Sequence, residues 1–231
     1  MKEPRSEVHN CDCVEFMRTL PDNYFDLAIA DPPYSYAGND DFAKRKRFNK
    51  GRFWRYRNVD GQDIDIDAWD KAPSDEFFDE MFRVSKNQII WGANYFDGMP
   101  ATKCFIIWKK QIPENFSMAM CEYAWTSFDR PAKMFRQHVA SNGETKIHPC
   151  QKSVALYAWI LKYYANDGET IFDPMVGSGS SRIAAYKMGF DYVGCELDKD
   201  YFDAQERRFA EECFGEMQMG NGETVKQLTL F

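Results

Sequence analysis

A carboxylate, two prolines and an aromatic ring follow one another at Asp31-Pro32-Pro33-Tyr34. The apolar run 24–30 before them is typical of a buried parallel strand, and the prolines end it because they donate no backbone hydrogen bond. Ligands of open α/β sheets bind at the carboxyl ends of strands, where this turn is expected. There Asp31 and the Pro32 carbonyl could accept the hydrogens of a flat amine whose ring stacks on Tyr34. The plainer interpretation is a rigid surface turn.

A glycine-rich turn is the second candidate site. Residues 170–181 predict a strand, the turn and the start of a helix near Ser180, and the next strand, 192–198, carries Glu196 near its end. This order is typical of a nucleotide-binding βαβ unit, although a packing turn has the same pattern. The turn is neither G-x-G-x-x-G nor a P-loop, and Asp173 beside it would repel a pyrophosphate. S-adenosylmethionine fits better, because its cationic groups suit Asp173, its carboxylate suits a helix N-terminus and its ribose can donate to Glu196.

The expected secondary structure puts both candidate sites at one edge of a sheet. Apolar runs predict further buried strands at 88–91 and 103–108, whereas 119–125 predicts either a strand or a short helix. Asp12 either caps the first expected helix or faces a ligand at the same edge as Asp31. Apolar residues at helical spacing, with their start and stop signals, predict helices at 14–20, 73–84, 154–164, 182–188 and 200–214.

The composition suits one α/β domain, expected over 1–215, with 44% hydrophobic residues among 231. No run of ~18 apolar residues predicts a membrane span, and the first residues show no apolar signal core, so we expect a soluble cytoplasmic protein without membrane contact. Seven cysteines without a C-x-x-C pair predict reduced, mostly buried thiols. Three histidines without ligand spacing predict no metal site.

Five motifs in this order resemble those of the DNA amino-methyltransferases, the N6-adenine and N4-cytosine family. The catalytic half comes first and the cofactor half last, as in the circularly permuted beta group, and the resemblance covers 10–210. The motifs are the acidic motif at 10–12, the catalytic motif at 31–34, a His-Pro-x-Gln-Lys motif at 148–152, the cofactor loop at 172–180 and the ribose acid Glu196. Ser153 and Met175 depart from the family's usual proline and phenylalanine.

The resemblance implies a Rossmann-like S-adenosylmethionine-dependent methyltransferase fold, with a mostly parallel seven-stranded sheet and helices on both faces. It implies that Asp31, Pro32, Pro33 and Tyr34 are catalytic. It also implies S-adenosylmethionine as the cofactor, contacted by Asp12, Asp31, His148, Lys152, Ser153, Phe172, Asp173, Pro174, Met175, Gly177, Ser178, Gly179, Ser180, Glu196 and Leu197.

The implied reaction is methyl transfer from S-adenosylmethionine to the N6 amine of an adenine flipped out of DNA. Asp rather than Ser at position 31 favours adenine by resemblance, and the N4 amine of cytosine is the alternative. Another planar amine, in RNA or a protein glutamine, is a second alternative. A catalytically silent DNA-binding module is a third, and the intact Asp31 and glycine turn argue against it.

A long loop at 35–66 contains a run of basic side chains interleaved with aromatics and without an acid. That pattern favours contact with a nucleic-acid strand, with cations for its phosphates and rings for its bases, over a solvated loop or a nuclear localisation signal, although the net charge of the chain is −7. The resemblance implies that this nucleic acid is double-stranded DNA. Residues 111–147 are a weaker candidate for target recognition. The expected DNA-binding residues are Lys44, Arg45, Lys46, Arg47, Lys50, Arg52, Trp54, Arg55 and Arg57.

The tail 216–231 ends in Gln227, Leu228, Thr229, Leu230 and Phe231. Its apolar side chains either dock on the protein's own core or form a linear motif for a partner's pocket. The motif resembles the peptide by which bacterial replication and repair proteins bind the DNA polymerase sliding clamp. It therefore predicts a clamp partner in a bacterial or phage-infected cell, and relatives of this kind suggest a homodimer.

Overall fold

The computed structural model describes residues 3–34, 72–115, 119–138, 146–148, 150–218 and 224–226. The DNA-binding residues expected at 44–57 and the partner motif expected at 227–231 lie outside the described residues.

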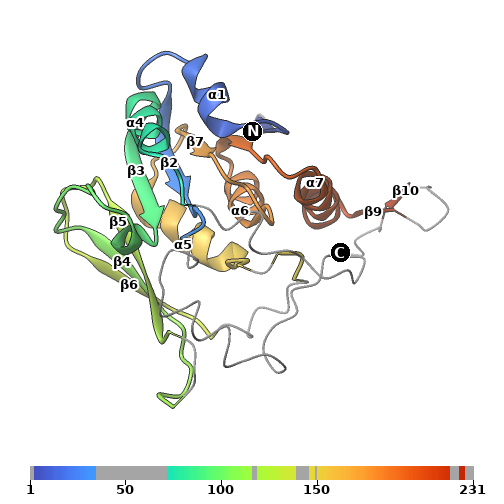
Figure 1. Ribbon diagram of the computed structural model, residues 1–231. Coiled ribbons are helices and arrows are strands. Elements are labelled where there is room, and N and C mark those ends of the chain that lie inside the picture. The colour runs from blue at the N-terminus through green and yellow to red at the C-terminus, as the bar shows by residue number, and fades with distance from the viewer. Residues whose placement is uncertain are drawn as a thin grey trace, which may run out of the picture.

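A large twisted sheet runs through the molecule, with helices on both of its faces (Figure 1). Its first five strands are parallel, the sixth runs antiparallel to both neighbours, and the last two are parallel to each other. In spatial order the strands are β1 (Ser6–His9), β8 (Asp191–Cys195), β7 (Thr170–Asp173), β2 (Phe25–Ala30), β3 (Ser85–Trp91), β5 (Cys121–Thr126), β4 (Phe105–Lys109) and β6 (Lys133–Arg136).

The expected α/β fold with a mostly parallel sheet is confirmed, but the expected count of seven strands is wrong. The sheet of the described residues has eight, because β6 adds an edge strand beside β4. The ambiguous segment 119–125 is strand β5. The short edge strands β1 and β6 were not expected, since each has only four residues and none that is fully buried.

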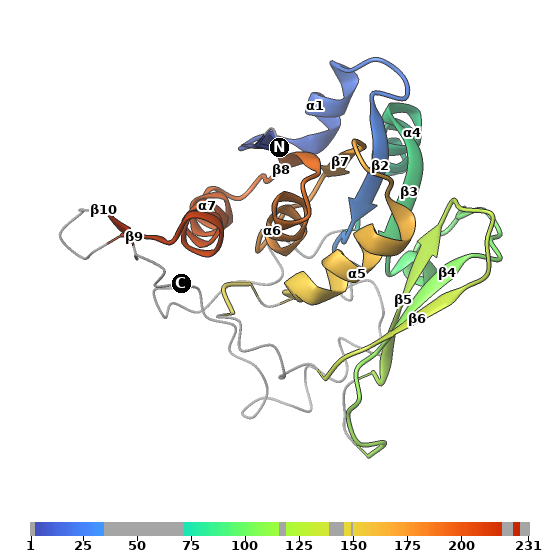
Figure 2. The same cartoon turned by 180° about the vertical axis from the view of Figure 1, so that it is seen from behind.

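Helices α1 (Cys13–Arg18) and α4 (Asp75–Val84) cover one face of the sheet. Helices α5 (Val154–Tyr164) and α6 (Ser180–Lys187) cover the other, and α7 (Lys199–Phe214) packs beside α6, as the reverse view shows (Figure 2). A short 3₁₀ helix, η2 (Ala93–Tyr95), follows β3. Part of the tail forms a two-stranded ribbon of β9 (Glu216–Gln218) and β10 (Thr224–Lys226), where only a loose tail was expected.

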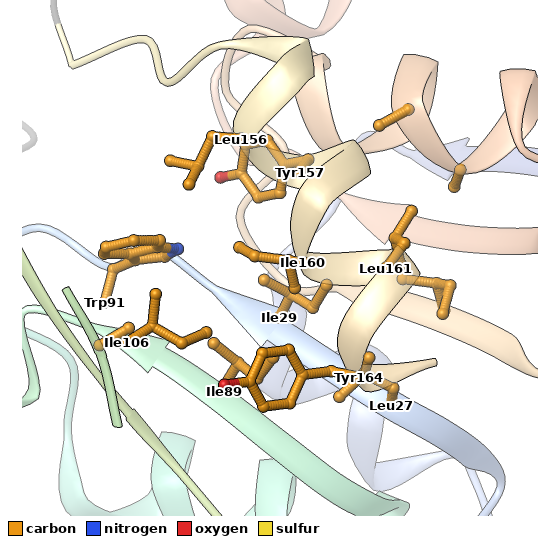
Figure 3. Close-up of a cluster of buried hydrophobic side chains, with 14 of the residues drawn as sticks. Leu27, Ile29, Ile89, Trp91, Ile106, Leu156, Tyr157, Ile160, Leu161 and Tyr164 are labelled. Atoms are coloured by element: carbon orange, nitrogen blue, oxygen red, sulfur yellow. The ribbon is translucent and has the colours of Figure 1, made fainter. Parts of the chain in front are cut away.

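Strand β2 is buried on both faces from Leu27 to Ala30, as its mostly apolar sequence predicts. Leu27 and Ile29 point toward α5, where they meet an apolar stripe that includes Ile160 and Leu161 (Figure 3). The alternate residues Ala28 and Ala30 belong to the cluster under α1 and α4. The strand is therefore clamped from both sides, and the turn that follows it has a rigid base.

Of the helices in the described part of the chain, none combines the length and the apolar character that crossing a bilayer takes. All seven cysteines are free thiols, as expected, but only Cys104 and Cys195 are buried, so the expectation of mostly buried thiols is wrong. The described residues include no group of three or more His, Cys, Asp or Glu side chains that could hold a metal ion.

Candidate active site

Four neighbouring parallel strands each deliver an acid to the same edge of the sheet. In spatial order, Asp12 follows β1, Glu196 follows β8, Asp173 ends β7 and Asp31 follows β2. β1 and β2 come from the start of the chain, whereas β7 and β8 lie beyond residue 169, and the parallel register is what aligns their carboxyl ends. The result is a row of carboxylates along one edge, suited to a cationic ligand.

Asp31 is largely buried at one end of this row. The Nζ atom of Lys152 lies 2.5 Å from its Oδ1, and the hydroxyl of Tyr34 donates to the same oxygen over 2.9 Å. Burial raises the pKa of Asp31 and outweighs the stabilising charge of Lys152. Both contacts go to Oδ1, so Oδ2 is the oxygen of Asp31 that a ligand could meet.

Lys152 is 4% exposed and joins Asp31 to two further charges. Its Nζ lies 3.3 Å from Oε2 of Glu122 on β5, whose Oε1 lies 2.7 Å from Nζ of Lys110. Burial alone would lower the pKa of Lys152, but the charges of Asp31 and Glu122 raise it well above its usual value. The ammonium also lies 5.0 Å from the ring centroid of Trp91. Lys152 is therefore a permanent cation inside the site.

Tyr34 is held by its surroundings as well as by Asp31. Its ring stacks on Tyr95 with centroids 5.1 Å apart and an interplanar angle of 21°. It also lies over Gly92, where an added Cβ would fall 2.0 Å from Cε1 of the ring, so only glycine fits at this position. A base that stacks on Tyr34 has to replace Tyr95 or use the opposite face of the ring.

The glycine turn begins at Asp173, whose carboxylate is buried and bound within the protein. Its Oδ2 accepts from Ser181 Oγ over 2.5 Å, and its Oδ1 accepts from the Met175 backbone N–H over 2.9 Å. Burial raises the pKa of Asp173 to about 7 despite these two donors. Gly177 and Gly179 have φ of 53° and 75°, the left-handed region, and so bend the turn into the start of α6.

Glu196 braces the same turn from β8. Its Oε2 accepts from the Gly177 backbone N–H over 2.8 Å, and its Oε1 accepts from the Asp198 N–H over 2.9 Å. A Cβ at Gly194 would fall 2.4 Å from Val176 Cγ2, so the strand and turn pack closely only because this residue is glycine. Glu196 keeps spare lone pairs on both oxygens, which ribose hydroxyls can use.

The segment before α5 crosses between the two candidate sites. The ring of His148 lies over the turn, 3.8 Å from where a Cβ of Gly177 would be, and packs edge-on against Tyr201. Burial lowers the pKa of His148 to about 4, so the ring is neutral at pH 7. Ser153 caps α5 by accepting from the Leu156 N–H over 3.1 Å.

Several residues expected at the cofactor have other uses in the structure. The Phe172 side chain is fully buried and stacks on Phe25 with centroids 4.3 Å apart, so it belongs to the core. Asp12 caps α1 through Oδ1, which was one of its two expected roles. Ser180 accepts from Arg208 over 2.8 Å and lies near Ser178.

The remaining expected residues occupy the turns themselves. Pro32 and Pro174 are buried, Pro33 and Met175 are half-buried, and Leu197 is exposed after β8. Of the expected recognition region 111–147, β5 and β6 are strands of the sheet, and residues 116–118 and 139–145 lie outside the described residues.

Four residues at the site were not expected there: Gly92, Tyr95, Lys110 and Glu122. The antiparallel pairing of β5 with β3 and β4 places Glu122 and Lys110 beside Lys152. A single sequence holds one signal for the pair: an acid within the apolar strand β5, and a lysine directly after the apolar strand β4. It does not say which strands are neighbours.

Residues 67–207, more than half of the chain, match the N6/N4 family of DNA methylases. The chain belongs to this family. The methylase is 22% identical to the type II methyltransferase M2.MboI of Moraxella bovis, over 88% of this chain and 87% of that relative. It is 22% identical to the type II methyltransferase M.HinfI of Haemophilus influenzae, over 87% of this chain and 67% of that relative.

Solved structures share the methylase's fold at low identity. TTHA0409 of Thermus thermophilus, a candidate DNA modification methylase solved with S-adenosyl-L-methionine, has a TM-score of 0.55 and 17% identity, covering 90% of this chain and 94% of that chain. The PvuII DNA methyltransferase, named as specific for cytosine N4, has a TM-score of 0.54 and 12% identity, covering 88% and 86%. These likenesses establish the methyltransferase fold.

Proposed function

We propose that this DNA methyltransferase transfers a methyl group from S-adenosylmethionine to the N6 amine of adenine in double-stranded DNA. The observation that carries the proposal is Asp31, fixed by Lys152 and Tyr34 through one oxygen at the end of a row of four acids. Membership of the N6/N4 family supplies the class of reaction.

The row of four acids suits S-adenosylmethionine bound with its adenine near Asp12 and its reactive methyl near Asp31. Asp12 lies at one end for the adenine amine, Glu196 follows for the ribose, Asp173 comes next beside the methionine, and Asp31 lies at the other end. The first three acids follow the order of adenine, ribose and methionine along S-adenosylmethionine, and the methyl group on its sulfonium would face Asp31. The acids also suit its cationic ammonium and sulfonium. S-adenosylmethionine supplies the methyl group as an electrophile.

Asp31 and the Pro32 carbonyl then hold the target amine. An exocyclic amine is a weak nucleophile, because its lone pair is delocalised into the ring. Acceptance of its two hydrogens by Oδ2 of Asp31 and by the carbonyl raises electron density on the nitrogen and aims its lone pair. Positioning and charge placement of this kind supply the acceleration, without a covalent enzyme intermediate.

The target base reaches this site only when it is flipped out of the duplex, which costs a few kcal/mol. Stacking on Tyr34 offsets ~1–3 kcal/mol of that cost. Phosphate contacts from the basic side chains at 44–57 offset more, with a strong dependence on salt.

The test is to incubate the protein with methyl-labelled S-adenosylmethionine and unmethylated bacterial genomic DNA, and then digest the DNA to nucleosides. Label in N6-methyldeoxyadenosine is the expected result. Label in N4-methyldeoxycytidine overturns the choice of adenine and supports the alternative that the shared fold with the PvuII enzyme raises. Label in RNA but not in DNA, tested in parallel, overturns the DNA substrate.

Binding of the tail 227–231 to the sliding clamp is a separate part of the proposal, as is a homodimer. Deleting 227–231 is expected to abolish clamp binding in a pull-down assay and to leave methyl transfer on short duplexes unchanged. Clamp affinity that survives the deletion contradicts the motif. Sedimentation of the full chain tests the dimer.

A further inference from the structure

The charges around Asp31 form a balanced chain. Two carboxylates alternate with two ammonium groups, in the order Asp31, Lys152, Glu122, Lys110, with contacts of 2.5, 3.3 and 2.7 Å between successive pairs. Lys152 thus divides its ammonium between two carboxylates, and it lies closer to Asp31. All four side chains are at most one quarter exposed, so solvent screens these charges only weakly.

We propose that Lys152 and Glu122 are positioning residues that set the charge on Asp31. Lys152 keeps Asp31 ionised although it is buried. Glu122 competes with Asp31 for the ammonium, so Asp31 remains a strong acceptor for the target amine. This inference rests on the proposed function, in which ionised Asp31 accepts a hydrogen from the amine.

The reason for two residues is a conflict between burial and function. A buried carboxylate without a cation takes up a proton and stops being an acceptor. A carboxylate that is fully paired with a lysine stays ionised, but the ammonium neutralises its charge and so weakens it as a hydrogen-bond acceptor. Because Asp31 shares Lys152 with Glu122, it lies between these two cases. It stays ionised and can still accept a hydrogen bond.

The two residues affect the pKa of Asp31 in opposite directions. The charge of Lys152 lowers it and the charge of Glu122 raises it, while burial is the largest influence and also raises it. The groups that face Asp31 come from several elements, and besides these two they are Tyr34, Cys150, Tyr157 and Asp173. Tyr157 is neutral at pH 7 because burial raises its pKa, and Cys150 is neutral because desolvation of its thiol and the charge of Asp31 raise its pKa to about 11.

The test is the pH profile of single-turnover methyl transfer, measured with saturating S-adenosylmethionine and unmethylated genomic DNA between pH 5 and pH 9. The rate is expected to follow the ionised fraction of Asp31, so a change in the pKa of Asp31 moves the midpoint of the acid limb. Lys152→Met is expected to move that midpoint up by about 1–3 pH units, and Glu122→Gln is expected to move it down. Glu122→Gln is also expected to lower the plateau rate.

Opposite shifts from two neighbouring residues are the signature of this role, because a merely structural loss would not reverse its sign. The matched control is Glu80→Gln, the same change in a Glu–Arg pair at the amino end of the sheet, where Oε2 of Glu80 lies 2.7 Å from Nη2 of Arg83. That variant is expected to keep the wild-type profile.

Three results would overturn the inference while the wild type still methylates DNA. The first is an acid limb that neither variant moves, and the second is a shift in the same direction for both. The third is a Lys152→Met variant whose pH profile is unchanged but whose Kd for S-adenosylmethionine, measured by calorimetry, is raised. That result would mean that Lys152 acts in cofactor binding instead. A wild type that transfers no methyl to DNA instead refutes the proposed function.

Folding is monitored by circular dichroism for each variant. If Glu122→Gln fails to fold, the double variant Glu122→Gln with Lys110→Met removes one charge of each sign, and it carries the same expectation of a downward shift. If Lys152→Met fails to fold, Lys152→Gln, which keeps a hydrogen-bond donor near Asp31, replaces it with the same expectation of an upward shift.

Discussion

Strand β2 has an aspartate–lysine pair at each of its ends, and the two pairs have opposite characters. At the amino end, Oδ1 of Asp26 lies 2.6 Å from Nζ of Lys86, and at the carboxyl end Oδ1 of Asp31 lies 2.5 Å from Nζ of Lys152. The distances are alike, but the Lys86 side chain is 55% exposed and the Lys152 side chain 4%. Only the surroundings distinguish the pairs.

The surroundings reverse the effect on the carboxylate. At Asp26 burial is partial, and the bonds from Lys86 and from the Thr170 N–H outweigh it, so the pKa is lowered. At Asp31 burial outweighs Lys152, and the charge of Glu122 adds to it, so the pKa is raised. The Asp26–Lys86 pair links neighbouring strands. The Asp31–Lys152 pair keeps a carboxylate ionised in a buried place that disfavours the charge. Such a cost is typical of a functional site.

The largest difference between the two pairs is expected when each carboxylate is removed. Asp31→Ala is expected to lower kcat for methyl transfer by about 10³-fold or more, because the amine loses its charged acceptor. Binding of S-adenosylmethionine, measured by calorimetry, is expected to stay close to that of the wild type. Asp26→Ala is expected to keep kcat within about twofold, because an exposed pair contributes little. Full activity of Asp31→Ala refutes its assigned role.

A smaller loss is expected from crowding the ring that orients Asp31. A methyl group at Gly92 collides with Tyr34, so Gly92→Ala is expected to lower kcat/KM by about 10–100-fold, as displaced catalytic groups do. Gly98→Ala is the matched control. Gly98 has a φ of 77°, close to the 65° of Gly92, but has open space around it. Equal losses in both variants, measured on the same DNA, would show that backbone strain alone is responsible.

The next smaller fall in methyl-transfer rate is expected from removing the hydroxyl of Tyr34. Tyr34→Phe keeps the ring on Gly92 and removes the donor to Asp31, and it is expected to lower kcat about 3–10-fold. The acid limb of its pH profile is expected to move up, because that donor lowers the pKa of Asp31. Tyr24→Phe, at the exposed amino end of the strand, is the control and is expected to change neither quantity. An unchanged Tyr34→Phe enzyme would show that the hydroxyl is not needed.

The sequence was enough to predict the carboxyl end of β2, because apolar runs, prolines and glycines act locally. The strand before Asp31, the helix that begins at Val154 and the turn at Gly177 lie where these signals put them. Membership of the N6/N4 family, expected from the motifs, is confirmed.

The partners of Asp31 were not predictable to the same degree. Lys152 was expected at the cofactor, but its position depends on how α5 packs over the sheet. Glu122 and Lys110 depend on the antiparallel insertion of β5 between β3 and β4, a long-range pairing that no local pattern specifies. Residue types can be read from a single sequence, whereas the charge balance of a buried site requires the three-dimensional neighbours.

The smallest test of the contrast compares stability across pH. Asp26 has a lowered pKa in the folded protein, so it stabilises the fold above its unfolded pKa and loses that contribution as the pH falls through the folded value. Asp31 has a raised pKa, so its ionised form destabilises the fold at neutral pH, and this penalty shrinks as the pH falls from that raised value to the unfolded pKa, below which it is gone. The two carboxylates should therefore affect melting in opposite directions.

Asp26→Asn is expected to lower Tm at pH 7 by about 1–2 °C, and Asp31→Asn is expected to raise it, since Lys152 keeps Glu122 as its partner. In thermal melts from pH 7 to pH 3, the gap to the wild type should close at a higher pH for Asp31→Asn than for Asp26→Asn. A fall in Tm for Asp31→Asn at pH 7 would mean that its pair with Lys152 stabilises the fold, as the pair at Asp26 does. The difference between the two ends of β2 would then be one of exposure alone.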